Sequence, residues 1–279
     1  MPIEQNTDAQ IVYVHSESMN RELPMMVFLP KSYHQSDRVF PVVELLHGMT
    51  SQWNDICEEN LHGLYPPTHG MGELADEWQV IIAAPITGNH FYLDSPLKPE
   101  IQMATYVGKE VPVFMDANYR TTGDRWGRII AGFSMGGFGA VRIYCLYPDT
   151  FQCCLVRAGV ADRAVDYKEG RSEPSATMLE IAGPYKGNEE FYDSQCNCSV
   201  LMENLKGRSD AAMVIECGRE DGLLSHNQLL RDTAAKLGID HIYAEYPGGH
   251  QWGMQPFRSM LCHLQQFRPT ILPEPLQPL

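Results

Sequence analysis

The sequence predicts an α/β fold in which a mostly parallel central sheet is flanked by helices. Six short, nearly continuous apolar runs follow one another along the chain, as expected for strands that are buried on both faces of a sheet. Segments with helical periodicity separate most of these runs, and this alternation favours right-handed crossovers between parallel strands. The 279 residues are 44% hydrophobic and 20% charged, which is enough apolar chain for one large core.

Two apolar segments near the start of the chain predict an antiparallel hairpin ahead of the parallel strands. Residues 11–14 and 25–29 flank the turn-like residues 19–22, so we expect the two segments to pair directly. The runs that we assign to the central sheet are residues 42–46, 80–84, 128–131, 153–156, 211–215 and 241–244.

Helical periodicity accounts for most of the intervening chain. We expect helices over residues 100–118, 136–147, 225–237 and 252–267, the first of them interrupted by Pro112. The polar stretch 161–210 contains several Gly and Pro residues and is too long for an ordinary connection, so it predicts an insertion with short helices of its own. We take residues 1–279 as a single domain in which this insertion is a lid, a pocket wall or a subunit contact. The Pro-rich tail 269–279 is expected to be extended.

The charge balance excludes two classes of partner. Lysine and arginine total 21 against 35 acidic residues, a net charge of −14, which disfavours binding to nucleic acid or to an anionic membrane surface.

The first eight residues show no secretory signal, and no apolar stretch is long enough to span a bilayer. The eight cysteines lack the paired spacing of zinc or redox motifs. We therefore expect a reduced, cytoplasmic protein without a metal site.

A candidate nucleophile lies between the run 128–131 and the predicted helix that follows it. The segment Gly132-Phe133-Ser134-Met135-Gly136 has the pattern Gly-x-Ser-x-Gly, which is weak alone but specific at a strand-to-helix turn. A serine in such a turn needs a strained backbone and neighbours without side chains, and the helix N-terminus favours developing negative charge. The pattern therefore predicts Ser134 as a nucleophile.

A base and an orienting acid are expected downstream of the serine. Asp221 follows the run 211–215, and His250 lies in a glycine-rich loop after the run 241–244. Both positions are at the carboxyl ends of strands, where open α/β sheets bind ligands. The chain order Ser, Asp, His predicts Asp221 as acid and His250 as base; Glu220 is the alternative acid.

Two backbone N–H groups are candidates for an oxyanion hole. One belongs to Met135, directly after the nucleophile, and the other to Met49, in the glycine-containing loop after the run 42–46. His47 of the same loop is an alternative base, but its place beside the glycine favours a hydrogen bond that fixes the loop.

Aromatic residues near these motifs are candidates for the substrate pocket. They are Trp53, Phe133 and Trp252, although aromatic side chains at the top of a sheet also serve simply as core. Arg157 is unexpected on a buried strand, and a buried arginine needs a carboxylate partner.

Four motifs, in this order along the chain, together resemble the esterase D-like "putative esterase" family of α/β-hydrolases, and within it most nearly the tributyrin esterases. They are His47-Gly48-Met49, the glycine-rich segment 132–137, Cys217-Gly218-Arg219-Glu220-Asp221 and Gly248-Gly249-His250-Gln251-Trp252. The likeness runs from about residue 10 to residue 268. It implies an α/β-hydrolase fold and an enzyme that cleaves short acyl esters of small molecules without a cofactor.

The resemblance leaves the substrate open. Acetylxylan or feruloyl esterases and S-formylglutathione hydrolases are alternatives, but the last typically carry His before the nucleophile and Cys in the oxyanion loop, where this chain has Phe133 and Thr50-Ser51. A hydrolase-fold binding module without activity is the non-enzymatic alternative. A homo-oligomer stays open as well.

Overall fold

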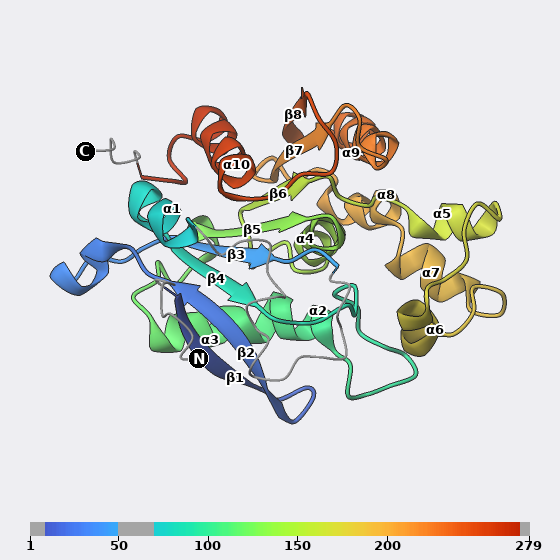
Figure 1. The fold of residues 1–279 in the computed structure, drawn as a ribbon, viewed down its shortest axis with the longest axis horizontal. Helices are drawn as coiled ribbons and strands as arrows, with labels where there is room; N and C mark the ends of the chain where they lie inside the picture. Colours follow the sequence, from blue (N-terminus) through green and yellow to red (C-terminus); the bar gives the residue numbers. More distant parts are fainter. Residues whose placement is uncertain (1–8, 50–69, 274–279) are drawn as a thin grey trace, which may run out of the picture.

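The computed structural model describes residues 9–49 and 70–273, and this part of the chain forms an eight-stranded sheet (Figure 1). The strand order is β1-β2-β4-β3-β5-β6-β7-β8. The strands are β1 Ala9–Ser16, β2 Arg21–Phe28, β3 Val42–Leu46, β4 Ile81–Pro85, β5 Arg128–Phe133, β6 Cys153–Arg157, β7 Ala212–Gly218 and β8 Asp240–Tyr246.

Strand directions agree with the sequence patterns. The hairpin β1–β2 is antiparallel and joins the sheet through an antiparallel pair of β2 with β4. All pairs from β4 to β8 are parallel, and the strands β3, β4 and β6 consist entirely of buried residues. Continuous apolar runs of this kind are what a sheet covered on both faces requires. The predicted fold class is confirmed.

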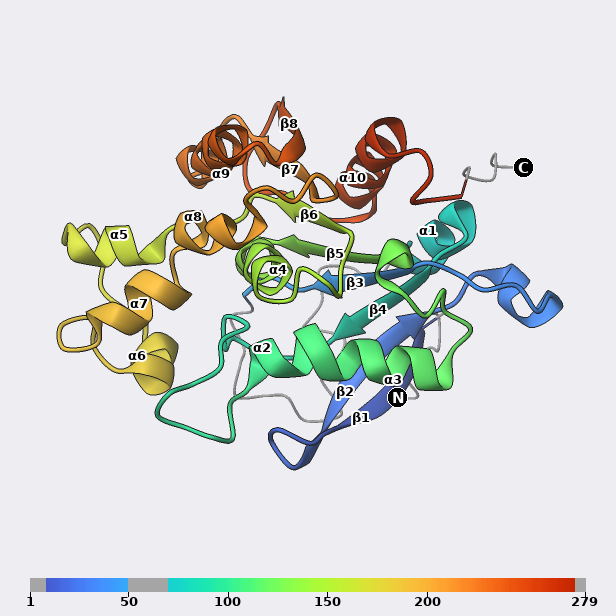
Figure 2. The same cartoon turned by 180° about the vertical axis from the view of Figure 1, so that it is seen from behind.

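Helices cover both faces of the sheet (Figures 1 and 2). One core cluster lies between the sheet and helices α1 and α10, and the other includes α3, α4 and α9. The bounds of the helices outside the insertion are α1 Met71–Trp78, α2 Met103–Thr105, α3 Val111–Asn118, α4 Met135–Leu146, α9 Leu224–Leu237 and α10 Met254–Phe267.

Two helical segments differ from the sequence-based prediction. Helix α1 was not expected, although its buried residues Met71, Leu74, Ala75 and Trp78 have helical spacing. The interruption expected at Pro112 is absorbed without a break, because residues Tyr106–Glu110 form a π-helical turn between α2 and α3. Proline lacks the N–H of a regular helix, and here it directly follows the π-helical turn, where the regular hydrogen-bond pattern already changes.

The insertion of residues 161–210 carries short helices at the carboxyl ends of the parallel strands (Figures 1 and 2). They are α5 Arg163–Lys168, α6 Ala176–Ala182, α7 Glu189–Gln195, α8 Cys198–Leu201 and the 3₁₀ turn Met202–Leu205. Arg142 of α4 is buried and donates to the carbonyl of Gln195 at 2.7 Å. Ser95 donates to the carbonyl of Ile181 at 2.5 Å. These contacts attach the insertion to the core.

The tail is described only as far as residue 273, and Ile271 and Leu272 are buried against the α1 and α10 core cluster. Seven cysteines fall in the described part of the chain; all are free and six are buried. Within the same residues, no helix has both the length and the apolar character needed to cross a bilayer.

Candidate active site

Ser134 occupies the sharp turn between β5 and α4. Its backbone has φ 58° and ψ −117°, a left-handed conformation that is unfavourable for a residue with a side chain. The turn is held from both sides, because the Ser134 N–H donates to the carbonyl of Arg157 at 3.0 Å and its carbonyl accepts from Phe138 N–H at 3.1 Å. Strain of this kind persists only where surrounding contacts enforce it.

The glycines around Ser134 are required by close backbone contacts. A Cβ on Gly132 would lie 2.1 Å from the carbonyl oxygen of Gly136. A Cβ on Gly136 would lie 2.0 Å from the carbonyl oxygen of Leu46. Any side chain at these two positions would therefore push β5, α4 and the loop after β3 apart.

Three side chains predicted from separate strand ends form one hydrogen-bonded line. His250 Nε2 is 2.9 Å from Ser134 Oγ, and His250 Nδ1 is 2.8 Å from Asp221 Oδ2. Since a carboxylate can only accept, Nδ1 carries the proton and Nε2 is left to accept from the serine hydroxyl. The Asp221 side chain is 1% exposed, and its second oxygen accepts from Leu223 N–H at 2.8 Å. This arrangement can move a proton from the serine to the imidazole.

The alternative acid, Glu220, is used differently in the structure. Its carboxylate accepts from the N–H of Gly248, and its own N–H donates to the Gly248 carbonyl at 3.1 Å. Glu220 therefore ties the loop that carries Asp221 to the loop that carries His250. Gly218 permits this approach, because a Cβ there would lie 2.2 Å from the Gly248 carbonyl oxygen. The role of Gly218 was not predicted; a glycine at the end of a buried strand was the only signal.

The loop after β3 lies against Ser134. A Cβ on Gly48 would be 3.5 Å from Ser134 Cβ. His47 is buried; its Nδ1 donates to the Gly48 carbonyl at 2.8 Å, and its Nε2 accepts from Thr87 N–H at 3.2 Å. Burial lowers the pKa of His47 to about 4. His47 is therefore neutral at physiological pH, and its hydrogen bonds hold the loop, as the sequence analysis suggested.

Tyr92 supports this loop through a hydrogen bond. Its hydroxyl donates to the His47 carbonyl at 2.9 Å, and its ring packs so closely on α4 that a Cβ on Gly139 would lie 2.3 Å away. Tyr92 is fully buried and belongs to the core, and this contact was not predicted from the sequence. Met135 is the first residue of α4. Met49 is an exposed residue at the end of the described part of the loop after β3. The N–H groups of these two methionines remain the candidate oxyanion donors.

Two of the three predicted pocket aromatics lie beside His250. The Phe133 ring centre is 4.5 Å from that of His250, and Trp252 stacks on Phe133 at 5.4 Å with an interplanar angle of 20°. Both aromatic side chains are half-buried. The third residue, Trp53, lies outside the described residues.

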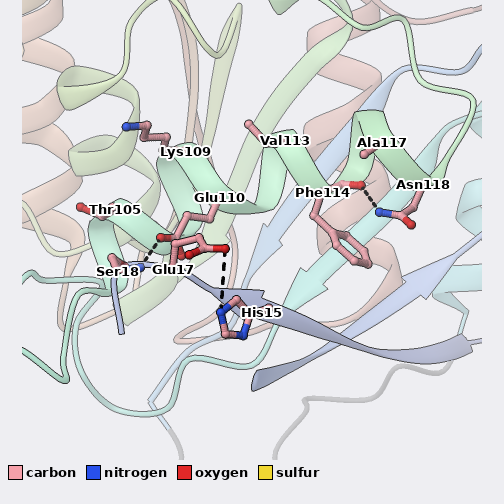
Figure 3. Close-up of a pocket in the computed structure, with 10 residues that line it drawn as sticks. All are labelled: His15, Glu17, Ser18, Thr105, Lys109, Glu110, Val113, Phe114, Ala117 and Asn118. Atoms are coloured by element: carbon pink, nitrogen blue, oxygen red, sulfur yellow. Dashed lines mark hydrogen bonds and ion pairs between the residues drawn. The ribbon is translucent and has the colours of Figure 1, made fainter. Parts of the chain in front are cut away.

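A separate cavity of about 660 Å³ lies between the β1–β2 hairpin and the helical segment around α3 (Figure 3). His15, Ser18, Glu110 and Phe114 are among its lining residues, and Glu110 accepts from the Ser18 N–H at 2.8 Å. None of the predicted site residues that the structure describes lines this cavity. This cavity is therefore lined by other residues than those of the Ser134 site.

Comparison with known proteins gives a family match over most of the sequence. The sequence profile of the family described as "Putative esterase" matches residues 16–267. Esterase Rv1288 of Mycobacterium tuberculosis is 25% identical over 251 residues, which cover 83% of this chain and 53% of that protein. The chain thus spans about half the length of this relative.

Two further proteins are similar over more of their own length. An acetyl esterase of Caldicellulosiruptor saccharolyticus is 27% identical over 219 residues, covering 71% of this chain and 80% of that protein. The solved structure of FphF, a fluorophosphonate-binding serine hydrolase of Staphylococcus aureus, superposes with a TM-score of 0.72 at 19% identity, covering 91% and 97% of the two chains. The structural likeness shows an α/β-hydrolase fold, and the profile match over most of the sequence shows that this chain belongs to the "putative esterase" family.

Proposed function

We propose that this protein is a serine carboxylesterase that hydrolyses short-chain acyl esters of small molecules. The observation that carries the proposal is the line of hydrogen bonds from Ser134 through His250 to Asp221. It starts at a serine in a left-handed turn at the N-terminus of α4, where a helix favours the negative charge of an acyl-transfer intermediate.

The mechanism has two halves. His250 Nε2 takes the proton of Ser134 Oγ while that oxygen attacks the ester carbonyl carbon, and Asp221 orients and stabilises the charged imidazole. The N–H groups of Met135 and Met49 stabilise the oxyanion. The C–O bond of the alcohol then breaks, and the alcohol leaves with the proton from His250. Water attacks the acyl-serine in the same way, with His250 as base, and the carboxylic acid is released.

Turnover of p-nitrophenyl esters from acetyl to octanoyl tests the reaction and the acyl preference. We expect the wild type to lose activity steeply as the acyl chain lengthens, and Ser134→Ala to be inactive although folded. A folded Ser134→Ala variant that keeps wild-type turnover would exclude the mechanism. A fluorophosphonate probe should label the wild type and not the variant, and a wild type that takes no label would favour the binding module.

The roles of the two neighbouring acids can be separated with a matched pair of amides. Asp221→Asn should reduce kcat by about four orders of magnitude, as in serine proteases whose triad aspartate is replaced. Glu220→Gln keeps an acceptor for the Gly248 N–H and should cost far less. A larger loss in Glu220→Gln than in Asp221→Asn would reverse the assignment.

A carbohydrate esterase of the feruloyl or acetylxylan type is the second candidate. The stacked rings of Phe133 and Trp252 beside His250 favour it, because they offer a half-exposed aromatic surface to an aromatic acid or to a sugar. Methyl ferulate, acetylated xylo-oligosaccharides and tributyrin, compared at equal enzyme concentration, distinguish the candidates. Preference for tributyrin supports the first proposal and preference for either of the others supports the second.

The remaining expectations stay predictions. Residues 1–279 are expected to form a single domain in which residues 161–210 are a lid, a pocket wall or a subunit contact. The protein is expected to be cytoplasmic and to need no cofactor for catalysis. Its oligomeric state is left open. Size-exclusion chromatography with light scattering measures the last of these directly.

A further inference from the structure

Arg157, at the end of β6, contacts both the turn of Ser134 and the loop of His250. Its carbonyl accepts from the Ser134 N–H. Its guanidinium is buried, donates through Nε to the carbonyl of Gln251 at 3.3 Å, and lies 3.6 Å from the ring centre of Tyr246. The carboxylate partner that a buried arginine requires is Glu216 on the neighbouring strand β7.

Glu216 extends this cluster to helix α10. Glu216 is 1% exposed, and its second oxygen accepts from Ser259 Oγ at 3.0 Å and contacts His263 Nδ1 at 2.6 Å. A buried ion pair is tolerated when its remaining hydrogen-bonding atoms are satisfied, and these contacts meet that condition. We call Arg157, Glu216, Ser259 and His263 the β6–β7–α10 cluster.

The cluster contacts the segment 247–253, which presents His250, through Arg157. Tyr246 ends β8 just before this segment, Gln251 lies within it, and α10, which carries Ser259 and His263, begins directly after it. The segment contains three glycines, and Gly248 and Gly253 have φ of 109° and 141°. Such a backbone has high conformational freedom and needs contacts from outside to hold one geometry. The His250 side chain is itself 40% exposed, so packing alone holds it weakly.

We propose that Arg157 is a positioning residue that holds segment 247–253 so that His250 is aligned with Ser134 and Asp221 together. The proposal rests on the proposed function, because the alignment affects rate only if His250 is the base. Its guanidinium acts at Gln251, one residue from His250, and not on the substrate. Loss of the contact should slow the chemical step and leave substrate binding nearly unchanged.

Two variants separate alignment from stability. Arg157→Lys keeps a cation for Glu216, but a lysine ammonium cannot cover the Tyr246 ring as a planar guanidinium does while also donating to Gln251. Arg157→Met combined with Glu216→Gln removes both charges, so neither is left buried without a partner. The matched control is Arg258→Met on α10, which breaks the pair of Arg258 with Glu77 of α1, 2.7 Å apart.

Kinetics and NMR together decide the proposal. We expect kcat for p-nitrophenyl acetate to fall roughly ten- to hundredfold in both Arg157 variants, with KM within about twofold, and Arg258→Met to behave as wild type. The low-field proton resonance of His250 Nδ1–H, assigned by its loss in His250→Gln, should weaken in the same two variants.

Several results would overturn the proposal. They are an unchanged resonance and kcat in folded Arg157 variants, an equal loss in Arg258→Met, or a failure of both Arg157 variants to fold while Glu216→Gln folds. A wild type without any ester turnover would instead contradict the proposed function, and the His250 resonance would still decide whether Arg157 aligns the ring.

Discussion

Glu44 of β3 and Glu216 of β7 are each 1% exposed within the same sheet, but their carboxylates have opposite surroundings. Glu216 has Arg157, Ser259 and His263 as partners. In the part of the chain that the structure describes, neither oxygen of Glu44 has a hydrogen-bond partner. Burial raises the pKa of Glu44 well above its usual range; Arg128 opposes this shift but is bonded to Asp116.

The comparison shows that the charge of a buried carboxylate is decided by its partners. At Glu216, a guanidinium and two further groups take the place of water as hydrogen-bond partners. Glu44 lacks such partners, so the neutral acid is the form that its site favours. Replacing each glutamate should therefore change stability in opposite directions.

Removal of the Glu216 charge should have the largest effect. Glu216→Leu leaves the Arg157 guanidinium buried without its carboxylate, and loss of one member of a buried pair costs about 3–5 kcal/mol. Urea unfolding of the variant measures this. A loss below about 1 kcal/mol would mean that Arg157 finds water or another acceptor, and the contrast with Glu44 would fail.

Removal of the Glu44 carboxyl should have the opposite sign. Glu44→Met replaces an unpartnered polar group with an apolar side chain of similar length, which should raise the free energy of unfolding by about 1–3 kcal/mol. The same urea titration is the measurement. A destabilised Glu44→Met variant would show that the carboxyl makes a favourable contact in solution.

The pH dependence of the free energy of unfolding tests the raised pKa of Glu44. Because the pKa of Glu44 is raised in the folded protein, its contribution to stability is fully present below the pKa of the unfolded chain and is lost as pH rises through the folded pKa. As pH rises above about 5, the advantage of Glu44→Met over wild type should therefore grow, by at most about 1.4 kcal/mol per pH unit. Parallel stability profiles of the two proteins would contradict the raised pKa.

An exposed ion pair gives the smallest expected effect and serves as the reference. Lys98 and Glu180 are 2.5 Å apart with side chains 37% and 48% exposed. Lys98→Met should change the free energy of unfolding by less than about 1 kcal/mol, because solvent screens such pairs. A loss as large as that of Glu216→Leu would mean that burial is not what separates the two kinds of carboxylate.

Much of the fold could be predicted because its signals are local. A strand that is buried on both faces has a nearly continuous apolar sequence wherever it lies in the sheet. The six apolar runs therefore identified β3 to β8. Helix α1 was missed although its apolar spacing is regular, because eight residues with a glycine near the start give a weak helical signal. The sequence also indicated which serine, acid and histidine to examine, and their roles stay predictions.

The contacts that support the candidate site could not be predicted. Tyr92 reaches the carbonyl of His47, 45 residues away, and Arg157 reaches Glu216, 59 residues away. No local pattern marks either contact, because each depends on how the sheet brings separate segments to within hydrogen-bond distance. Gly218 could not be predicted for the same reason. A glycine is required there because the loops of Asp221 and His250 touch, and that contact depends on the tertiary structure.

The strand runs, the glycine-flanked serine turn and the chain order of Ser134, Asp221 and His250 could all be identified from the amino-acid sequence. These follow from apolar periodicity and from the steric limits of a few neighbouring residues. Three contacts depend on how the whole chain packs: Asp221 and not Glu220 contacts His250, Arg157 pairs with Glu216, and Glu44 has no hydrogen-bond partner among the described residues. A hydrogen bond requires its donor and acceptor atoms to lie within a range of about 0.5 Å. Only the packing of the whole sheet positions distant residues that closely.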